Sequence, residues 1–123
     1  MEMRHTGWVL FMDKTEQLRK WVLRKASERP GEKIHIRTFQ LAYQFKLPQP
    51  HVEDEIVHLV VEGLIEASAF DGRKQRDIPI QQWGSVNAFF QSSDDAGYIR
   101  IRSRSRGREL VEDLLPSMAA LIS

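Results

Sequence analysis

Cysteine is absent from the 123 residues, which excludes disulfides and thiol chemistry. A chain without cysteine suits a reducing compartment, so we expect a cytoplasmic protein. Long apolar runs are missing as well. The stretch from Trp8 to Met12 is too short for the core of a signal peptide and far too short to span a bilayer, so we expect no membrane partner.

The chain also lacks a large excess of positive or negative charge. The formal net charge is only +1, so any attraction to nucleic acid must come from local asymmetry. The chain contains no Gly-rich phosphate loop and no Ser-His-Asp order with a nucleophile elbow, and we therefore expect no enzyme and no cofactor. With 41% hydrophobic residues, a chain of this length can build one ordinary core, which predicts a single domain over residues 1–123.

The most informative stretch predicts two helices joined by a short turn. The first helix covers 38–45, and Pro48 and Pro50 interrupt it because proline lacks a backbone donor and disfavours helix at the preceding residue. The second helix runs from about position 51 to Gly63, which permits a left-handed cap, and the extended segment 64–70 follows. The apolar stripes are Phe39, Ala42 and Phe45 in the first helix and Val52, Ile56, Leu59 and Val60 in the second.

This order of helix, turn and helix, followed by the run from Glu62 to Glu66 (Glu-Gly-Leu-Ile-Glu), closely resembles the winged-helix regulators of bacteria. In that family such a Gly-Leu-Ile follows the recognition helix and begins the wing. Residues 98–115 look like the returning wing strand and the Gly-Arg-Glu-Leu opening of the closing helix. The resemblance implies a protein that binds duplex DNA and regulates transcription. It also implies a homodimer formed through the terminal helices.

The expected fold is α+β and mainly helical: a winged helix-turn-helix with a three-stranded antiparallel sheet, a long structured wing insertion and a C-terminal helix. The strands are predicted near 34–36, 64–70 and 98–103. Residues 1–12 are expected to form an N-terminal arm or strand, because they include a run of β-formers. Asp13 and Glu16 match a capping box for a helix that ends near Glu28, and the C-terminal helix is expected over 107–123.

The wing insertion, residues 71–97, is too long for an unstructured loop. Asp71 and Gly72 indicate a turn, and Ser85 is a candidate cap for about two turns of helix. Its aromatic residues allow two interpretations: they pack the insertion onto the body, or they stack on bases or contact a partner. These residues are Trp83, Phe89 and Phe90.

Arginines alternate along the last expected strand, which places their side chains on one face. That face could contact phosphates, or it could be the solvated side of the sheet, paired with carboxylates such as Glu62, Glu66 and Asp71. A second basic cluster lies at the start of the wing. The candidate DNA-binding residues are Arg37, Gln40, Gln44, Lys46, Gln49, His51, Arg73, Lys74, Arg76, Arg100, Arg102 and Arg104.

The expected recognition helix opposes the DNA-binding interpretation. It carries Glu53, Asp54 and Glu55 near its start and no lysine or arginine. These carboxylates interact favourably with the positive end of the helix dipole, but they would be repelled by the phosphates that line a DNA groove. The alternative is a protein-protein interaction module that uses this acidic third helix and the aromatic insertion. His51 and His58 stand at helical spacing from these acids, but no second ligand pair appears elsewhere, so we expect a solvated helix face and no metal.

Overall fold

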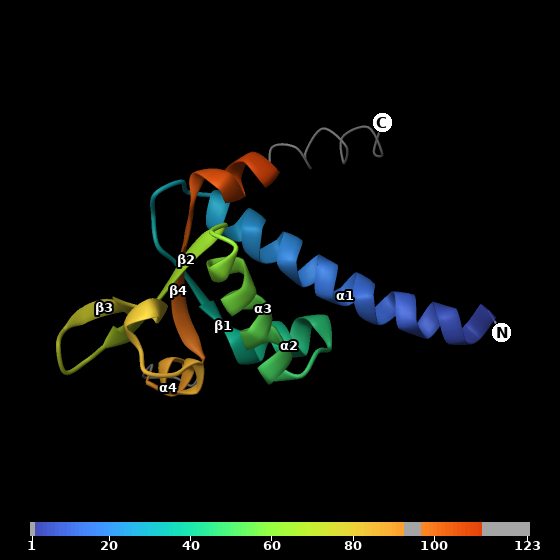
Figure 1. Ribbon diagram of the computed structural model, residues 1–123, viewed down its shortest axis with the longest axis horizontal. Coiled ribbons are helices and arrows are strands. Elements are labelled where there is room, and N and C mark those ends of the chain that lie inside the picture. Colours follow the sequence, from blue (N-terminus) through green and yellow to red (C-terminus); the bar gives the residue numbers. More distant parts are fainter. Residues whose placement is uncertain (1, 93–96, 112–123) are drawn as a thin grey trace.

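The computed structural model describes residues 2–92 and 97–111, and only the backbone of residues 2–13. The protein has an α+β fold in which helices pack against an antiparallel sheet (Figure 1). The elements are α1 (Glu2–Ser27), β1 (Ile34–Arg37), α2 (Thr38–Phe45), α3 (Gln49–Val61), β2 (Ile65–Asp71), β3 (Arg76–Pro79), the 3-10 helix η1 (Ile80–Gln82), α4 (Val86–Gln91) and β4 (Tyr98–Ser103).

The chain becomes helical again at residues 105–111, where the C-terminal helix is predicted. The remainder of that prediction, residues 112–123, lies outside the described residues. The predicted homodimer contact depends partly on the same segment.

The sheet has four strands in the order β1-β4-β2-β3, so the prediction of three strands is wrong. The additional strand is β3, which pairs antiparallel with β2. Ile78 is the one buried apolar side chain of β3. The sequence of this strand therefore shows no alternation of polar and apolar residues from which a strand could be predicted. The strand forms because the turn after Asp71 folds it back on β2, where Ile78 pairs with Ala69.

The prediction of an arm or strand over residues 1–12 is also wrong. Helix α1 already begins at Glu2, so Asp13 lies inside a helix and does not cap one. Strand propensity is a weak signal without a neighbouring strand. An established helix extends by one hydrogen bond per residue, and no proline interrupts it before Pro30.

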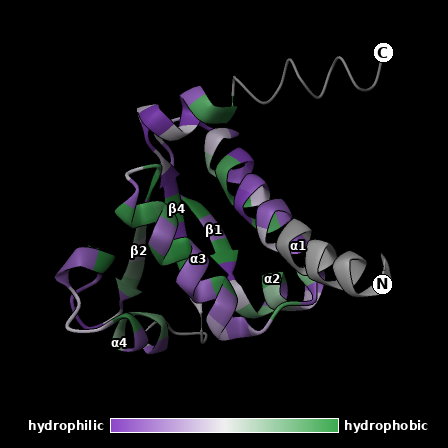
Figure 2. Cartoon of the chain, turned by 45° about the vertical axis from the view of Figure 1, so that its right-hand side comes forward, coloured by the Kyte–Doolittle hydropathy of each residue, from purple (hydrophilic) through white to green (hydrophobic). Residues whose placement is uncertain are grey.

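The core lies between the helices and one face of the sheet, with α1 packed on β4 and α3 packed on β2. Alternation along β4 directs Ile99 and Ile101 into this core and Arg100 and Arg102 to the opposite face. Figure 2 shows the hydrophilic surfaces of α1 and α3 turned away from the sheet. The predicted stripe on α2 needs one correction: Phe39 is 44% exposed, because Leu41 takes the buried position.

Two glycines set the connections at the ends of β2 and β4. Gly63 adopts φ 76 after α3, and Leu64 N donates to Leu59 O at 3.0 Å, which confirms the predicted left-handed end. Gly107 lies in the first turn of the last helix, close to Leu64, which directly precedes β2. A Cβ atom at Gly107 would lie 2.1 Å from the carbonyl oxygen of Leu64, so only glycine permits this approach.

The wing insertion carries local structure, as predicted. Ser85 Oγ accepts a hydrogen bond from Ala88 N at 3.0 Å and caps α4. Phe89 and Phe90 are buried, and the Trp83 ring packs edge-on against Phe89 with its centroid 6.0 Å away. The aromatic residues therefore attach the insertion to the body, which confirms the packing interpretation.

Candidate nucleic-acid interface

The turn between β2 and β3 presents three cationic side chains, Arg73, Lys74 and Arg76, to solvent. Asp71 Oδ1 shapes this turn by accepting from Arg73 N at 2.9 Å and from Lys74 N at 3.4 Å. Within residues 14–92 and 97–111, none of the three cations forms an ion pair. The β2–β3 hairpin projects from the body at the end of the molecule opposite the start of α1 (Figure 1).

The arginines of β4 point to the outer face of the sheet, as predicted, and they are paired there. Arg100 Nη1 donates to Asp77 Oδ2 at 2.9 Å, and Lys33 Nζ reaches the same oxygen at 2.9 Å. Arg102 Nε donates to Glu66 at 2.7 Å. Pairing with carboxylates is thus confirmed for both arginines, although Asp77 replaces the expected Glu62 or Asp71.

Asp77 is the most buried carboxylate of this network, with 12% of its side chain exposed. Burial alone would raise the pKa of the Asp77 carboxyl. The hydrogen bond from Lys33 and the positive charge of Arg100 outweigh burial and hold this pKa below its ordinary value. Burial, followed by the charge of Arg100, lowers the pKa of His35, while Asp77 opposes this shift.

Two further candidate residues flank the paired arginines on the outer face. The Arg37 guanidinium carbon lies 5.2 Å from the centroid of the Tyr98 ring, a cation–π contact at the end of β1. The Tyr98 hydroxyl hydrogen-bonds to the His35 ring. Arg104, just after β4, is exposed. The outer face therefore carries arginine from one end of the sheet to the other.

The predicted base-reading residues at the start of α3 are turned toward the protein. Gln49 Nε2 donates to Glu53 Oε1 at 3.1 Å and to Thr38 Oγ1 at 3.3 Å. His51 Nε2 lies 3.0 Å from Thr15 Oγ1 on α1. Because both side chains serve contacts between helices, the twelve predicted residues do not form one surface.

The three acids of α3, Glu53, Asp54 and Glu55, do not form one acidic surface, because two of them contact different neighbouring helices. Arg19 of α1 donates to Glu55 at 3.1 Å and to Glu62 at 2.7 Å. Burial pulls the pKa of the Arg19 guanidinium down, but the hydrogen bonds and charges of Glu62 and Glu55 outweigh it and raise this pKa. Glu53 accepts from Gln49 within α3 and from Thr38 of α2. Asp54 alone of the three acids is therefore exposed.

The remaining candidates lie on the helix-turn-helix. Gln40 and Gln44 are exposed on α2. Lys46 ends that helix in a left-handed conformation with φ 55, and its side chain is exposed. Lysine tolerates this conformation here because the backbone N–H of Lys46 still reaches the carbonyls of Ala42 and Tyr43.

Three residues of the outer face escaped sequence reasoning: Lys33, Asp77 and Gln81. Lys33 directly precedes a correctly predicted strand, so its place beside the sheet could be predicted from the sequence. Its carboxylate partner could not be predicted. Asp77 belongs to β3, and Gln81 belongs to η1 just after it. Neither could be placed without the unpredicted strand.

Among the described residues, no helix combines the length and apolar composition that a bilayer span requires. The same part of the chain holds no cluster of three or more histidine, aspartate or glutamate side chains arranged for a metal ion. Compared with known proteins, the chain matches no family model, no curated protein and no solved structure.

Proposed function

We propose that the protein is a winged-helix DNA-binding protein that regulates transcription and contacts the phosphates of duplex DNA through the β2–β3 hairpin. The observation that carries this proposal is the hairpin turn, where Arg73, Lys74 and Arg76 project into solvent without an ion-pair partner in the described part of the chain. Exposed cations on a projecting hairpin can reach phosphates at little desolvation cost.

The order of the elements supports the proposal. A first helix, a small strand, a helix-turn-helix, a strand leading into a hairpin and a returning strand follow one another as the resemblance implies. The returning strand β4 lies between β1 and β2. Under this proposal α3 would serve as the recognition helix, and the β2–β3 hairpin would form the first part of the wing between β2 and β4.

The mode of binding follows from what α3 offers. This helix carries no lysine or arginine, and both Gln49 and His51 are engaged within the protein. Phosphate contacts supply affinity but little sequence information, whereas base contacts supply specificity. We therefore expect binding that depends steeply on salt and weakly on sequence.

The test is binding to random-sequence duplex DNA at several salt concentrations, with the oligomeric state recorded on the same sample. The variant is Arg73→Gln, Lys74→Gln and Arg76→Gln combined. It should lower affinity at low salt by at least about tenfold, and it should reduce the slope of log K against log salt by up to about 0.9 for each phosphate that the variant no longer neutralises. Arg100 and Arg102 are unsuitable for this test, because neutralising either one also removes an ion pair with a carboxylate of the sheet.

The matched control removes the same charge elsewhere: Lys20→Gln, Lys25→Gln and Arg29→Gln on α1 and the loop after it. Each of these side chains is at least 36% exposed and pairs with a glutamate three or four residues away. The control should bind nearly as wild type. Equal weakening of both variants would mean that net charge alone attracts DNA, and no binding at low salt would refute the proposal.

The alternative, a protein-interaction module, has less surface than the sequence suggested. Glu53 and Glu55 serve contacts within the protein, and Phe89 and Phe90 are buried.

A further inference from the structure

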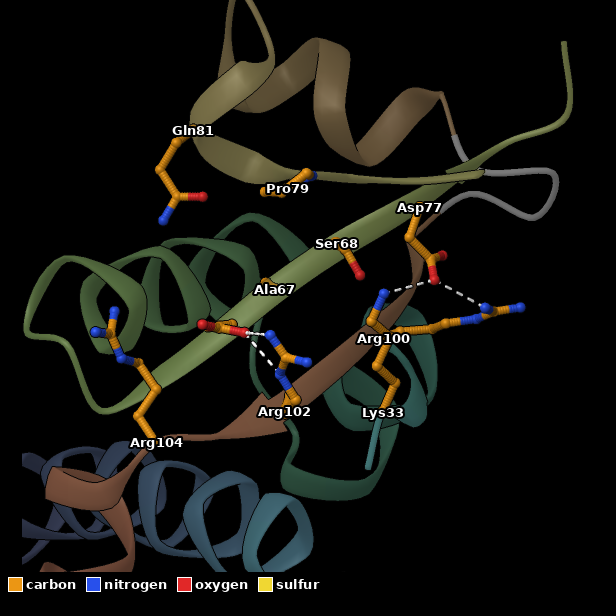
Figure 3. A pocket seen from close by; sticks show the side chains of 10 residues that line it. Lys33, Ala67, Ser68, Asp77, Pro79, Gln81, Arg100, Arg102 and Arg104 are labelled. Atoms are coloured by element: carbon orange, nitrogen blue, oxygen red, sulfur yellow. Dashed lines mark hydrogen bonds and ion pairs between the residues drawn. The ribbon is translucent and has the colours of Figure 1, made fainter. Parts of the chain in front are cut away.

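The outer face of the sheet contains a hollow of about 240 Å³ that is separate from the hairpin turn. Ala67 and Ser68 of β2 form its floor, Pro79 and Gln81 line one side, and Arg104 lines the opposite side (Figure 3). The hollow exists because β3 and η1 rise beside β2 on one side and the long side chains of β4 rise on the other.

The charges around the hollow are unequal in number. Its cationic side chains are Lys33, Arg100, Arg102 and Arg104, and its carboxylates are Glu66 and Asp77. Four cations against two carboxylates leave a surplus of two positive charges. Asp77 is shared by Lys33 and Arg100, and Glu66 accepts from Arg102. An anion entering the hollow would therefore meet cations that the protein's own carboxylates do not fully neutralise.

Hydrogen-bond donors around the hollow are also incompletely used. Arg100 Nε and Asp77 Oδ1 are both buried and have no hydrogen-bond partner within the described residues. Arg104 forms no ion pair with that part of the chain. In Figure 3 the Gln81 amide and the Arg104 guanidinium extend from opposite sides of β2 toward one another. Buried donors normally have acceptors, so this arrangement favours a ligand rich in acceptor oxygens.

We propose that this hollow binds the phosphate group of a small phosphorylated molecule. A phosphate monoester carries about −1.5 to −2 charge near pH 7, which matches the surplus of two positive charges, whereas a carboxylate carries only one. Arginine forks suit phosphate oxygens. The volume lies below the roughly 300–1,000 Å³ of pockets for drug-sized ligands, so the ester is small. This site is separate from the hairpin turn, and the proposal does not rest on DNA binding.

The test is calorimetric titration of the full chain with inorganic phosphate and with ethyl phosphate at constant ionic strength, using acetate as the monoanion control. Saturable binding of both phosphates in the millimolar range or tighter is expected, with weaker binding of acetate. Arg104→Gln should weaken phosphate binding by about tenfold, as expected for the loss of one charge-assisted hydrogen bond. Gln81→Ala, which removes no charge, should weaken it less.

The matched control is Arg106→Gln. Arg106 is exposed, lies two residues beyond Arg104 and does not line the hollow, so this variant should bind phosphate as wild type does. Circular dichroism of each variant verifies that it is folded. Absence of saturable phosphate binding, or equal weakening by Arg106→Gln, would overturn the proposal.

Duplex DNA added to the phosphate-loaded protein separates two sources of the phosphate group. If DNA leaves phosphate bound, the ligand is a small molecule that binds beside the DNA surface. If DNA displaces phosphate from wild type, and Arg104→Gln also weakens DNA binding, the hollow takes a backbone phosphate. The triple hairpin variant should keep its phosphate affinity in the first case, even where DNA binding fails.

Discussion

Helix α3 and the outer face of the sheet both combine acids with arginine, but they use them differently. On α3, one arginine from another helix holds two carboxylates, so acids outnumber the cation. On the outer face, one carboxylate holds two cations, so cations outnumber the acid. The same kind of ion pair thus joins helices in one region and leaves surplus positive charge in the other.

The difference shows that a run of like-charged residues in the sequence does not by itself produce a surface of the same charge in the fold. The three acids of α3 suggested a negative front, yet two of them are used inside the protein. The arginines of β4 were consistent with either phosphate contact or pairing with carboxylates, and two of them are paired. What remains for a partner is the excess: Asp54 on α3, and Arg104 with the hairpin cations elsewhere.

The largest effect on stability is expected from Glu55→Lys. The Glu55 side chain is 12% exposed and accepts from Arg19, so a lysine would place two cations together between α1 and α3. Because the pair is only partly buried, we expect a loss of about 2 kcal/mol in the free energy of unfolding. Urea denaturation measures it.

The control for this change is Asp54→Lys, which alters the charge equally at the neighbouring position. Asp54 is exposed, so its replacement should change stability by no more than about 0.5 kcal/mol. Equal destabilisation by both substitutions would show that the total charge of α3, and not the Arg19 bridge, sets the effect.

A smaller loss is expected from Asp77→Asn, which leaves Lys33 and Arg100 without their shared carboxylate. We expect a loss of about 1–2 kcal/mol at neutral pH. The pKa of Asp77 is lowered by folding, so its contribution is present above the ordinary aspartate value and is lost as the pH falls through the lower folded value. The difference between wild type and variant should therefore be constant above about pH 5 and shrink below about pH 4.

Denaturation curves between these pH values test the sign of the Asp77 effect. Glu66→Gln is the comparison, because Glu66 is 42% exposed and pairs with one arginine rather than two cations. Its loss should be the smaller one. A difference between Asp77→Asn and wild type that grows in acid would contradict the assigned network.

Local signals predicted the helix-turn-helix well. Helix α2 covers the expected residues 38–45, and α3 ends two residues before the expected glycine, because prolines and a left-handed glycine act within a few residues. Strand β4 was predicted from the alternation of arginine along it and from its resemblance to a returning wing strand. These three elements carry six of the twelve candidate DNA-binding residues, and the hairpin cations that carry the proposal lie outside them.

The remaining features depend on partners far away in the chain. Helical spacing showed that Glu55 lies on one face of α3, but not that Arg19, 36 residues earlier, occupies that face. Strand β3 exists through its pairing with β2, and it brings in Asp77 and the wall of the hollow. Sequence periodicity contains no information on such pairings when only one buried apolar residue marks the strand.

The smallest effect concerns DNA affinity and uses the exposed acid of α3. If α3 lies near the DNA as the winged-helix proposal requires, Asp54→Lys should remove a repulsion, add one phosphate contact and raise affinity for random-sequence duplex by a few fold at low salt. Glu16→Lys makes the same change of charge on α1, where Glu16 is 68% exposed, and should have less effect. Equal gains from both would place α3 no nearer the DNA than α1. A gain confined to Asp54→Lys would orient α3 toward the duplex together with the hairpin.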